Sequence, residues 1–193
     1  QGYKENDPMG GHDPYSSSKG CSELVTSAYR RSFLQEQGVG LASARAGNVI
    51  GGGDWADDRL IPDILRSFEK NESVVVRNPK ATRPWQHVLE PLSGYLVLIQ
   101  KLYEDQKEYA EGWNFGPNEK DVKAVDWILD KMIFKWPGAS WKLDQNSSPH
   151  EAGFLKLDIT KAESKLGWKP VWELSYTLEK IIAWQKAWLN KED

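Results

Sequence analysis

Residues 13–19 (DPYSSSK) place a phenol and an ammonium group four residues apart, where a helix is expected to begin. Side chains at positions i and i+4 lie on the same face of a helix. A tyrosine titrates near ~10, and a fixed cation beside a phenol favours the phenolate form. Tyr15 and Lys19 are therefore a candidate acid–base pair for moving a proton on a hydroxyl group.

The spacing alone does not identify a working pair, because three pairs share it: Tyr15/Lys19, Tyr103/Lys107 and Tyr176/Lys180. The second pair lies in a charged run that is typical of a solvated helix end. The third enters a C-terminal helix with its lysine on the polar side. Only the first pair follows a loop rich in glycine, aspartate and proline and precedes a helix, a strand and a glycine-rich turn. This context favours the first pair as the one that carries chemistry.

Length and composition exclude several classes of protein. A chain of 193 residues can form one good core or one and a half small domains. Its net charge of -3 and isoelectric point near 5.7 give no support for a nucleic-acid partner. No run approaches the ~18 apolar residues of a membrane span, so we expect no membrane partner. The ten tryptophans are expected to lie mostly in the core.

Cysteine and histidine are scarce in this sequence. The single cysteine, Cys21, excludes an intramolecular disulfide and suits a reducing compartment, so we expect a cytoplasmic location. The histidines are isolated from one another at His12, His87 and His150. Because no His/Cys cluster has the spacing of metal ligands, we expect no metal site.

Hydrophobic periodicity and turn residues predict alternating helices and strands. Helices are expected at 15–37, 60–68, 92–103, 122–136, 158–166 and 177–190, and strands at 41–45, 73–76, 113–117 and 141–143. Gly38 and Gly40 end the first helix, and Pro62 fits the first turn of the second. This alternation predicts an α/β fold.

A glycine-rich turn follows the first predicted strand, in residues 46–53 (AGNVIGGG). Asparagine and several glycines after a strand are typical of the carboxyl edge of an α/β sheet, where open backbone binds ligands. The alternative is a turn that has no role in binding. The residues by themselves leave both interpretations open.

A later segment joins a guanidinium, an indole and an imidazole at Arg83, Trp85 and His87. An arginine fork matches a diphosphate in two-point geometry, and Trp85 could pack on a ring. The alternative is an Arg/Trp pair on the surface without a ligand. By itself, His87 is more typical of a hydrogen-bonded structural histidine than of a catalyst.

Four motifs in this order resemble the extended short-chain dehydrogenase/reductase family that acts on nucleotide sugars. They are Tyr15-x-x-x-Lys19, residues 45–51 (RAGNVIG), residues 83–88 (RPWQHV), and Leu157-Asp158-x-x-Lys161-Ala162 with residues 166–170 (LGWKP). The order matches over nearly the whole chain, which is more specific than any single motif. More closely, residues 7–21, 52–63 and 83–91 are similar to dehydratases of this family that act on CDP-glucose.

The resemblance implies a reaction and a cofactor. A tightly held NAD+ would accept a hydride from C4 of the glucosyl ring, water would leave across C5–C6, and the hydride would return to C6. The product would be CDP-4-keto-6-deoxyglucose, with no net use of NAD. Tyr15, as phenolate, would take the C4 hydroxyl proton. Lys19 would stabilise that phenolate and contact the nicotinamide ribose.

The resemblance also implies roles for other residues. Ala46 would line the nicotinamide pocket, and the diphosphate or nucleotide would contact Asn48, Arg59 and Arg83. Weaker candidates on the substrate side are Trp85, His87, His150 and Glu151. Some relatives place an arginine just before the glutamate that Glu151 resembles. Here residues 148–150 (SPH) precede it, which leaves that phosphate contact without its arginine.

The fold that the resemblance implies is the last strands and helices of an NAD-binding Rossmann fold plus a smaller α/β sugar-nucleotide-binding domain. Residues 1–50 and 91–117 would belong to the Rossmann part, and residues 51–90 and 118–193 to the substrate domain. The family's Gly-x-x-Gly-x-x-Gly motif is absent from this sequence. We therefore expect a C-terminal part that alone neither holds NAD tightly nor turns over.

The resemblance further implies a homodimer or higher homo-oligomer, because in relatives the helix with the Tyr/Lys pair packs in a dimer bundle. Two other functions remain open. One is an epimerase or decarboxylase of the same family, against which residues 54–55 and 83–85 argue. The other is a non-catalytic sugar-nucleotide-binding module, against which the intact Tyr15 and Lys19 argue.

Overall fold

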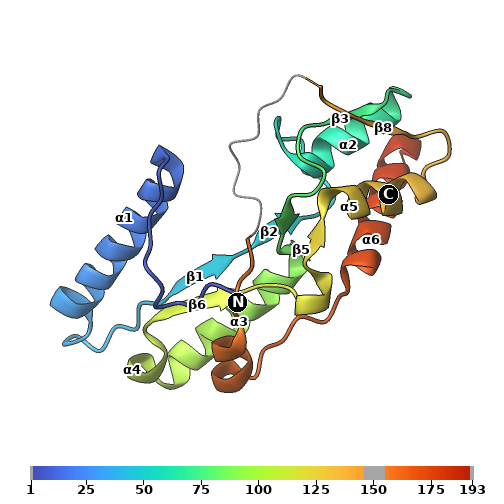
Figure 1. The fold of residues 1–193 in the computed structure, drawn as a ribbon. Helices are drawn as coiled ribbons and strands as arrows, with labels where there is room; N and C mark the ends of the chain where they lie inside the picture. Colours follow the sequence, from blue (N-terminus) through green and yellow to red (C-terminus); the bar gives the residue numbers. More distant parts are fainter. Residues whose placement is uncertain (1, 146–154, 192–193) are drawn as a thin grey trace. The chain divides into compact units, whose positions relative to one another are not determined.

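The computed structural model describes residues 2–145 and 155–191, which form two compact units (Figure 1). Each unit is built from three segments of the chain. Unit 1 comprises Gln1–Ala46, Leu89–Gly116 and Leu157–Lys169, and unit 2 comprises Gly47–Val88, Pro117–Lys156 and Pro170–Asp193.

Unit 1 contains a parallel strand pair with helices. Its elements are α1 (Pro14–Tyr29), the π-helix η1 (Arg30–Leu34), β1 (Ser43–Ala46), α3 (Leu89–Glu104), α4 (Gln106–Tyr109), β6 (Gly112–Phe115) and the π-helix η3 (Ala162–Leu166). Strand β1 pairs with β6 in parallel, with Ser43 opposite Gly112 and Ala46 opposite Phe115 (Figure 1). Both strands therefore present their carboxyl ends at the same edge.

The core of unit 1 forms around two aromatic residues of β6, Trp113 and Phe115, which are fully buried. The other members of this core come from α3 and from the C-terminal segment: Leu98, Ile159, Ala162, Leu166 and Trp168. Helix α3 approaches closely because position 94 is glycine: a Cβ there would lie 2.3 Å from Phe115 Cδ1.

The described residues of unit 2 form three short strand pairs and three longer helices. Its elements are β2 (Asn48–Ile50), α2 (Leu60–Glu69), β3 (Val74–Val76), β4 (Thr82–Arg83), β5 (Trp85–His87), the 3-10 helix η2 (Glu119–Asp121), β7 (Lys123–Ala124), α5 (Val125–Lys135), β8 (Trp141–Leu143) and α6 (Leu174–Asn190). Strands β2 and β5 pair in parallel, as do β3 and β8, whereas β4 and β7 are antiparallel.

Helices α2, α5 and α6 bury their apolar faces in the core of unit 2. The fully buried side chains at this core include Ile64, Phe68, Ile128, Leu129, Met132, Leu178 and Ile181. Their spacing within each helix is that of one helical face, which is why the sequence predicts these helices. In the part of the chain that the structure describes, no helix combines the length and apolar character needed to cross a bilayer.

The helix boundaries differ from the predicted ones at two places in unit 2. Helix α5 begins at Val125, three residues late, because Lys123–Ala124 pairs with Thr82–Arg83 as a strand. Helix α6 begins at Leu174, three residues early. Its first N–H donates to the buried carboxylate of Asp121 (2.9 Å), which caps the helix from another segment.

The chain crosses between the two units at several points, and the domain division stays a prediction. The units change after Ala46, Val88 and Gly116, near the predicted breaks at 50, 90 and 117. The segment Leu157–Lys169, predicted within the second domain, lies in unit 1 because Ala162 and Trp168 join the core around Trp113. The functional identity of each domain stays a prediction.

Candidate functional site

Tyr15 and Lys19 lie on one exposed face of α1. The Lys19 ammonium nitrogen is 5.4 Å from the centroid of the Tyr15 ring, and Tyr15 is 69% exposed. The predicted juxtaposition of the two groups is therefore present in the structure. Their catalytic role stays a prediction.

The start of α1 is fixed by local contacts. Asp13 is the N-cap, and its carboxylate accepts a hydrogen bond from the Ser16 N–H (2.9 Å). The pKa of Asp13 lies below its ordinary value, and the hydrogen bonds from the Ser16 side chain and backbone are the largest causes of this shift. The Ser17 hydroxyl donates to the carbonyl oxygen of Gly11 (3.1 Å), so the preceding loop lies against the helix. These contacts orient the first turn, on which the phenol stands.

The other two Tyr/Lys pairs can be compared with Tyr15 and Lys19 by whether both residues lie in one helix. Tyr103 lies in the last turn of α3 and Lys107 lies in α4, so these two residues do not share a helix. Tyr176 and Lys180 share α6, with the ammonium 4.9 Å from the ring centroid. Pair geometry therefore eliminates one rival but not the other. The sequence context is what separates Tyr15 from Tyr176.

Two predicted substrate residues meet in the parallel pair of β2 and β5. Asn48 lies opposite Trp85 in the register, and its N–H donates to the carbonyl oxygen of Pro84 (3.0 Å). Gly47 permits this approach, because a Cβ there would lie 2.5 Å from the same oxygen. The sequence motif around position 47 is thus explained by close contact between two strands.

Trp85 and His87 are both buried. Trp85 belongs to the core of unit 2 and is 6% exposed, which differs from the alternative of a surface Arg/Trp pair. The His87 ring lies against the indole of Trp172, with 4.7 Å between ring centroids. Packing accounts for both side chains, and their roles toward a substrate stay predictions.

The two predicted phosphate-binding arginines lie in unit 2. Arg59 is exposed at the N-cap of α2, where no side chain caps the helix. Arg83 lies in β4, half-buried, and its guanidinium donates to the carbonyl oxygen of Thr82 (3.0 Å). Ala46 ends β1 in unit 1. His150 and Glu151 lie outside the residues that the structure describes.

The loop that leads into Arg59 is fastened to α2 by Arg66, which the sequence analysis did not single out. The Arg66 guanidinium donates to the carbonyl oxygens of Trp55 and Ala56, at 3.2 Å each, and pairs with Asp63. A side chain that holds loop carbonyls cannot be recognised from a motif, because its partners are backbone atoms. The sequence signals such a contact only through the position of Arg66, nearly two turns after the start of α2.

A second missed group lies on α1 itself. Glu23 follows Lys19 by four residues, and its carboxylate accepts two hydrogen bonds from Arg45 on β1. The regular spacing of Tyr15, Lys19 and Glu23 is a signal that could have pointed to it. Among residues 2–145 and 155–191, no group of three or more His, Cys, Asp or Glu side chains could hold a metal ion.

Comparison with known proteins gives a consistent set of similarities. Residues 1–181 match the sequence model of the family described as GDP-mannose 4,6 dehydratase. The chain is 61% identical to the CDP-glucose 4,6-dehydratase of Salmonella typhimurium over 198 residues, which cover 100% of this chain and 55% of the relative. The chain spans about half the length of the curated relatives it matches.

Two solved structures illustrate the similarity in fold. A UDP-glucuronic acid 4-epimerase mutant from Bacillus cereus, in complex with UDP-4-deoxy-4-fluoro-glucuronic acid and NAD, has a TM-score of 0.82 at 18% identity; the match covers 97% of this chain and 57% of that one. The dTDP-glucose 4,6-dehydratase of Bacillus anthracis, in complex with NAD, has a TM-score of 0.74 at 17% identity, with coverages of 96% and 56%. These similarities confirm the predicted fold class, an α/β protein with part of a Rossmann fold.

Proposed function

Since this chain belongs to the GDP-mannose 4,6 dehydratase family, we propose that the full-length protein is a CDP-glucose 4,6-dehydratase. It would convert CDP-D-glucose to CDP-4-keto-6-deoxy-D-glucose and water. The observation that carries this proposal is the 61% identity to the Salmonella enzyme over the full chain. Another curated relative, the dTDP-glucose 4,6-dehydratase of Escherichia coli, is 25% identical.

NAD is the cofactor in this proposal. When bound, it accepts a hydride from the sugar and returns it later in the same turnover. The residues present fit its nicotinamide end. The Lys19 ammonium is exposed on the same face as the Tyr15 phenol and can donate to ribose hydroxyls, and Ala46 adds no bulk at the carboxyl end of β1.

Tyr15 supplies the acid–base step in this proposal. As phenolate, it takes the proton of the C4 hydroxyl, and the Lys19 ammonium lies 5.4 Å from the centroid of its ring. Removal of the C4 hydrogen leaves a ketone, which acidifies the proton at C5. Water can then be lost across C5–C6.

The diphosphate would be held by residues of unit 2. Arg59 and Arg83 supply guanidinium groups that suit phosphate oxygens, and the amide of Asn48 adds a donor. Trp85, His87, His150 and Glu151 remain the weaker candidates for substrate contact. A positively charged clamp of this kind binds the nucleotide part, which does not react, and leaves the glucosyl carbon free for chemistry.

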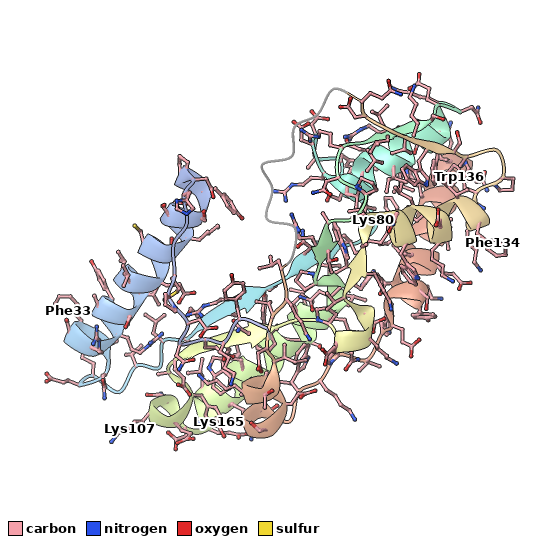
Figure 2. All side chains as sticks on the ribbon, in the orientation of Figure 1. Phe33, Lys80, Lys107, Phe134, Trp136 and Lys165 are labelled. Atoms are coloured by element: carbon pink, nitrogen blue, oxygen red, sulfur yellow. The ribbon has the colours of Figure 1, made fainter. Side chains whose placement is uncertain are left out.

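A homodimer and a cytoplasmic location are also part of the proposal. Helix α1 and the π-helix η1 that follows it expose a set of apolar side chains that a second copy would cover: Leu24, Val25, Tyr29 and Phe33. Phe33, which lies in η1, is labelled in Figure 2. Burial of such side chains in a dimer would remove apolar surface from water.

Product analysis on the purified full-length protein tests the function. CDP-glucose should give a 4-keto product, while UDP-glucose, dTDP-glucose and GDP-mannose should react much more slowly. Tyr15→Phe should lower kcat by about 10²–10⁴-fold, because it removes the acid–base group. Tyr176→Phe is the matched control and should retain activity. An epimerised or decarboxylated sugar as product, or no reaction with CDP-glucose, would contradict the proposal.

A further inference from the structure

A carboxylate on α1 is bound by two side chains of β1. Glu23 accepts hydrogen bonds from Arg45 Nε (2.8 Å), Arg45 Nη2 (2.9 Å) and Ser43 Oγ (2.7 Å). The pair is largely shielded from water, with 17% of the Glu23 side chain and 24% of the Arg45 side chain exposed. Such a two-pronged contact fixes geometry as well as charge.

The guanidinium of Arg45 is held from its other side as well. Its Nη1 donates to the carbonyl oxygen of Glu5 (3.0 Å), and the Glu5 carboxylate accepts from the N–H of Asn114 on β6 (3.0 Å). Gly112 leaves room for the guanidinium, since a Cβ there would lie 2.7 Å from Arg45 Nη2 and would make it shift. The fork therefore connects α1 to both strands of the parallel pair.

A second contact holds α1 nearer its C-terminal end. Arg30 follows Glu23 by seven residues, and its Nε donates to the carbonyl oxygen of Leu41, just before β1. Two polar contacts about two turns apart lie on one side of a helix. Together they set both the direction of α1 and its rotation about its own axis.

Among the described residues, apolar packing contributes little to this orientation. The only buried residue of α1 is Gly20, and none of the residues that form the core of unit 1 comes from α1. Within the described residues, directional polar contacts therefore fix the rotation of α1, and the two-pronged Glu23–Arg45 contact is joined by the Arg30–Leu41 hydrogen bond. The Glu23–Arg45 fork is thus the main device that orients the face bearing Tyr15 and Lys19.

We propose that Glu23 and Arg45 are positioning residues that place the phenol of Tyr15 and the ammonium of Lys19 for proton transfer. This inference rests on the proposed function. Glu23 follows the two reactive residues at the same four-residue interval, so a rotation of α1 that breaks the fork also turns both groups. A displacement of ~1 Å at a reacting group can reduce the rate by ~10²-fold.

The test uses the full-length protein with Glu23→Gln and Arg45→Lys, which keep side-chain size or charge but lose the two-pronged contact. Each should lower kcat for CDP-glucose by about 10–100-fold. The KM should change by less than about threefold, since the proposed diphosphate contacts lie in unit 2. The double variant should be no slower than the slower single variant, because both changes break one interaction.

Hydrogen exchange supplies a readout that does not depend on turnover. Both variants should raise amide exchange in Pro14–Tyr29, while Leu60–Glu69 keeps its protection. The matched control is Glu111→Gln, whose carboxylate pairs with Lys161 (2.9 Å) and Lys165 (3.5 Å) within unit 1; Lys165 is labelled in Figure 2. This control should change neither kcat nor the exchange of α1.

Each other outcome is decisive. Variants that keep wild-type kcat, or that change KM alone, would overturn the inference. A loss of protection that extends to unit 2 would assign the fork to general stability and would overturn it too. If the wild type does not react with CDP-glucose, the proposed function fails. The inference then depends on α1 exchange: an increase limited to the Glu23 and Arg45 variants supports it, and no increase rejects it.

Discussion

Gly52 lies directly against the indole of Trp184, so closely that a Cβ at position 52 would stand 2.4 Å from Trp184 Cδ2. Trp184 in turn packs on Trp188, with 5.8 Å between centroids, and on Trp55, with 6.0 Å. At this position the missing side chain makes room for an aromatic ring. The glycine-rich turn therefore serves packing within unit 2 at Gly52, one of the two interpretations that the sequence left open.

Gly52→Ala should destabilise the protein by about 1–3 kcal/mol, because the added methyl group forces Trp184 out of its place. Denaturant unfolding followed by tryptophan fluorescence measures this change. The same substitution in a Trp184→Leu background should cost clearly less, since the smaller side chain leaves room. Equal costs in the two backgrounds would refute the contact as the cause.

Arg66→Met should raise the KM for CDP-glucose by about three- to tenfold with little change in kcat, if Arg59 binds the diphosphate as proposed. The reason is that Arg66 holds the carbonyl oxygens of Trp55 and Ala56 in the loop that leads to Arg59. Steady-state kinetics of the full-length protein measures both constants.

The control for this prediction is Lys80→Met, which removes an exposed ion pair with Asp126 in the same unit (Figure 2). Surface pairs of this kind contribute ~0–1 kcal/mol, so neither constant should change. A KM that stays at the wild-type value in Arg66→Met would show that the loop does not depend on this arginine.

Asp121→Ala should lower the free energy of unfolding by about 1–2 kcal/mol, a cost typical of a lost helix cap. Its buried carboxylate accepts the hydrogen bond from the Leu174 N–H that begins α6. Thermal or denaturant unfolding measures the loss. Glu173→Gln, which breaks an exposed pair with Lys120 beside the same helix start, should have a much smaller effect.

Stability should decrease in acid partly through Glu23. The hydrogen bond from Arg45 is the largest cause that holds the pKa of Glu23 below its ordinary value, and it outweighs the opposing effect of burial. A group whose pKa is lower in the folded state stabilises the fold above its unfolded pKa, near ~4.3, and loses that contribution as pH falls through the folded value.

Glu23→Gln should therefore be less stable than the wild type at pH 7, by about 1–2 kcal/mol, and the difference should shrink below pH ~4. Urea unfolding from pH 7 to pH 3 measures the two curves. Curves that stay parallel over this range would show that ionisation of Glu23 does not contribute to stability.

Much of the fold follows from local patterns in the sequence. The apolar spacing of α2, α5 and α6 predicts three helices whose apolar faces form the core of unit 2. Short strands such as Thr82–Arg83 and Lys123–Ala124 were not predicted, because two residues carry no periodicity and the paired residues are 42 and 40 positions apart. The early start of α6 was missed for the same reason, since its cap comes from Asp121.

In the candidate site, too, local relations could be predicted from the sequence and contacts between distant segments could not. Tyr15 and Lys19 are found from their spacing and context because one helix presents both. Glu23 and Arg45 were missed because their relation is tertiary: an acid on a helix and a base on a later strand are ordinary residues in sequence. The burial of Trp85 was also beyond prediction, since an indole suits a core and a ligand equally.

The alternation of the chain between the two units has a consequence for its synthesis. The core of unit 1 requires Trp168, and the core of unit 2 requires Leu174, Leu178 and Ile181. During synthesis, the core of unit 1 stays incomplete until Trp168 has left the ribosome, and the core of unit 2 stays incomplete until Ile181 has left it. The two units must therefore be completed almost at the same time, and a nascent chain stalled before these residues would leave both cores open to chaperones and proteases.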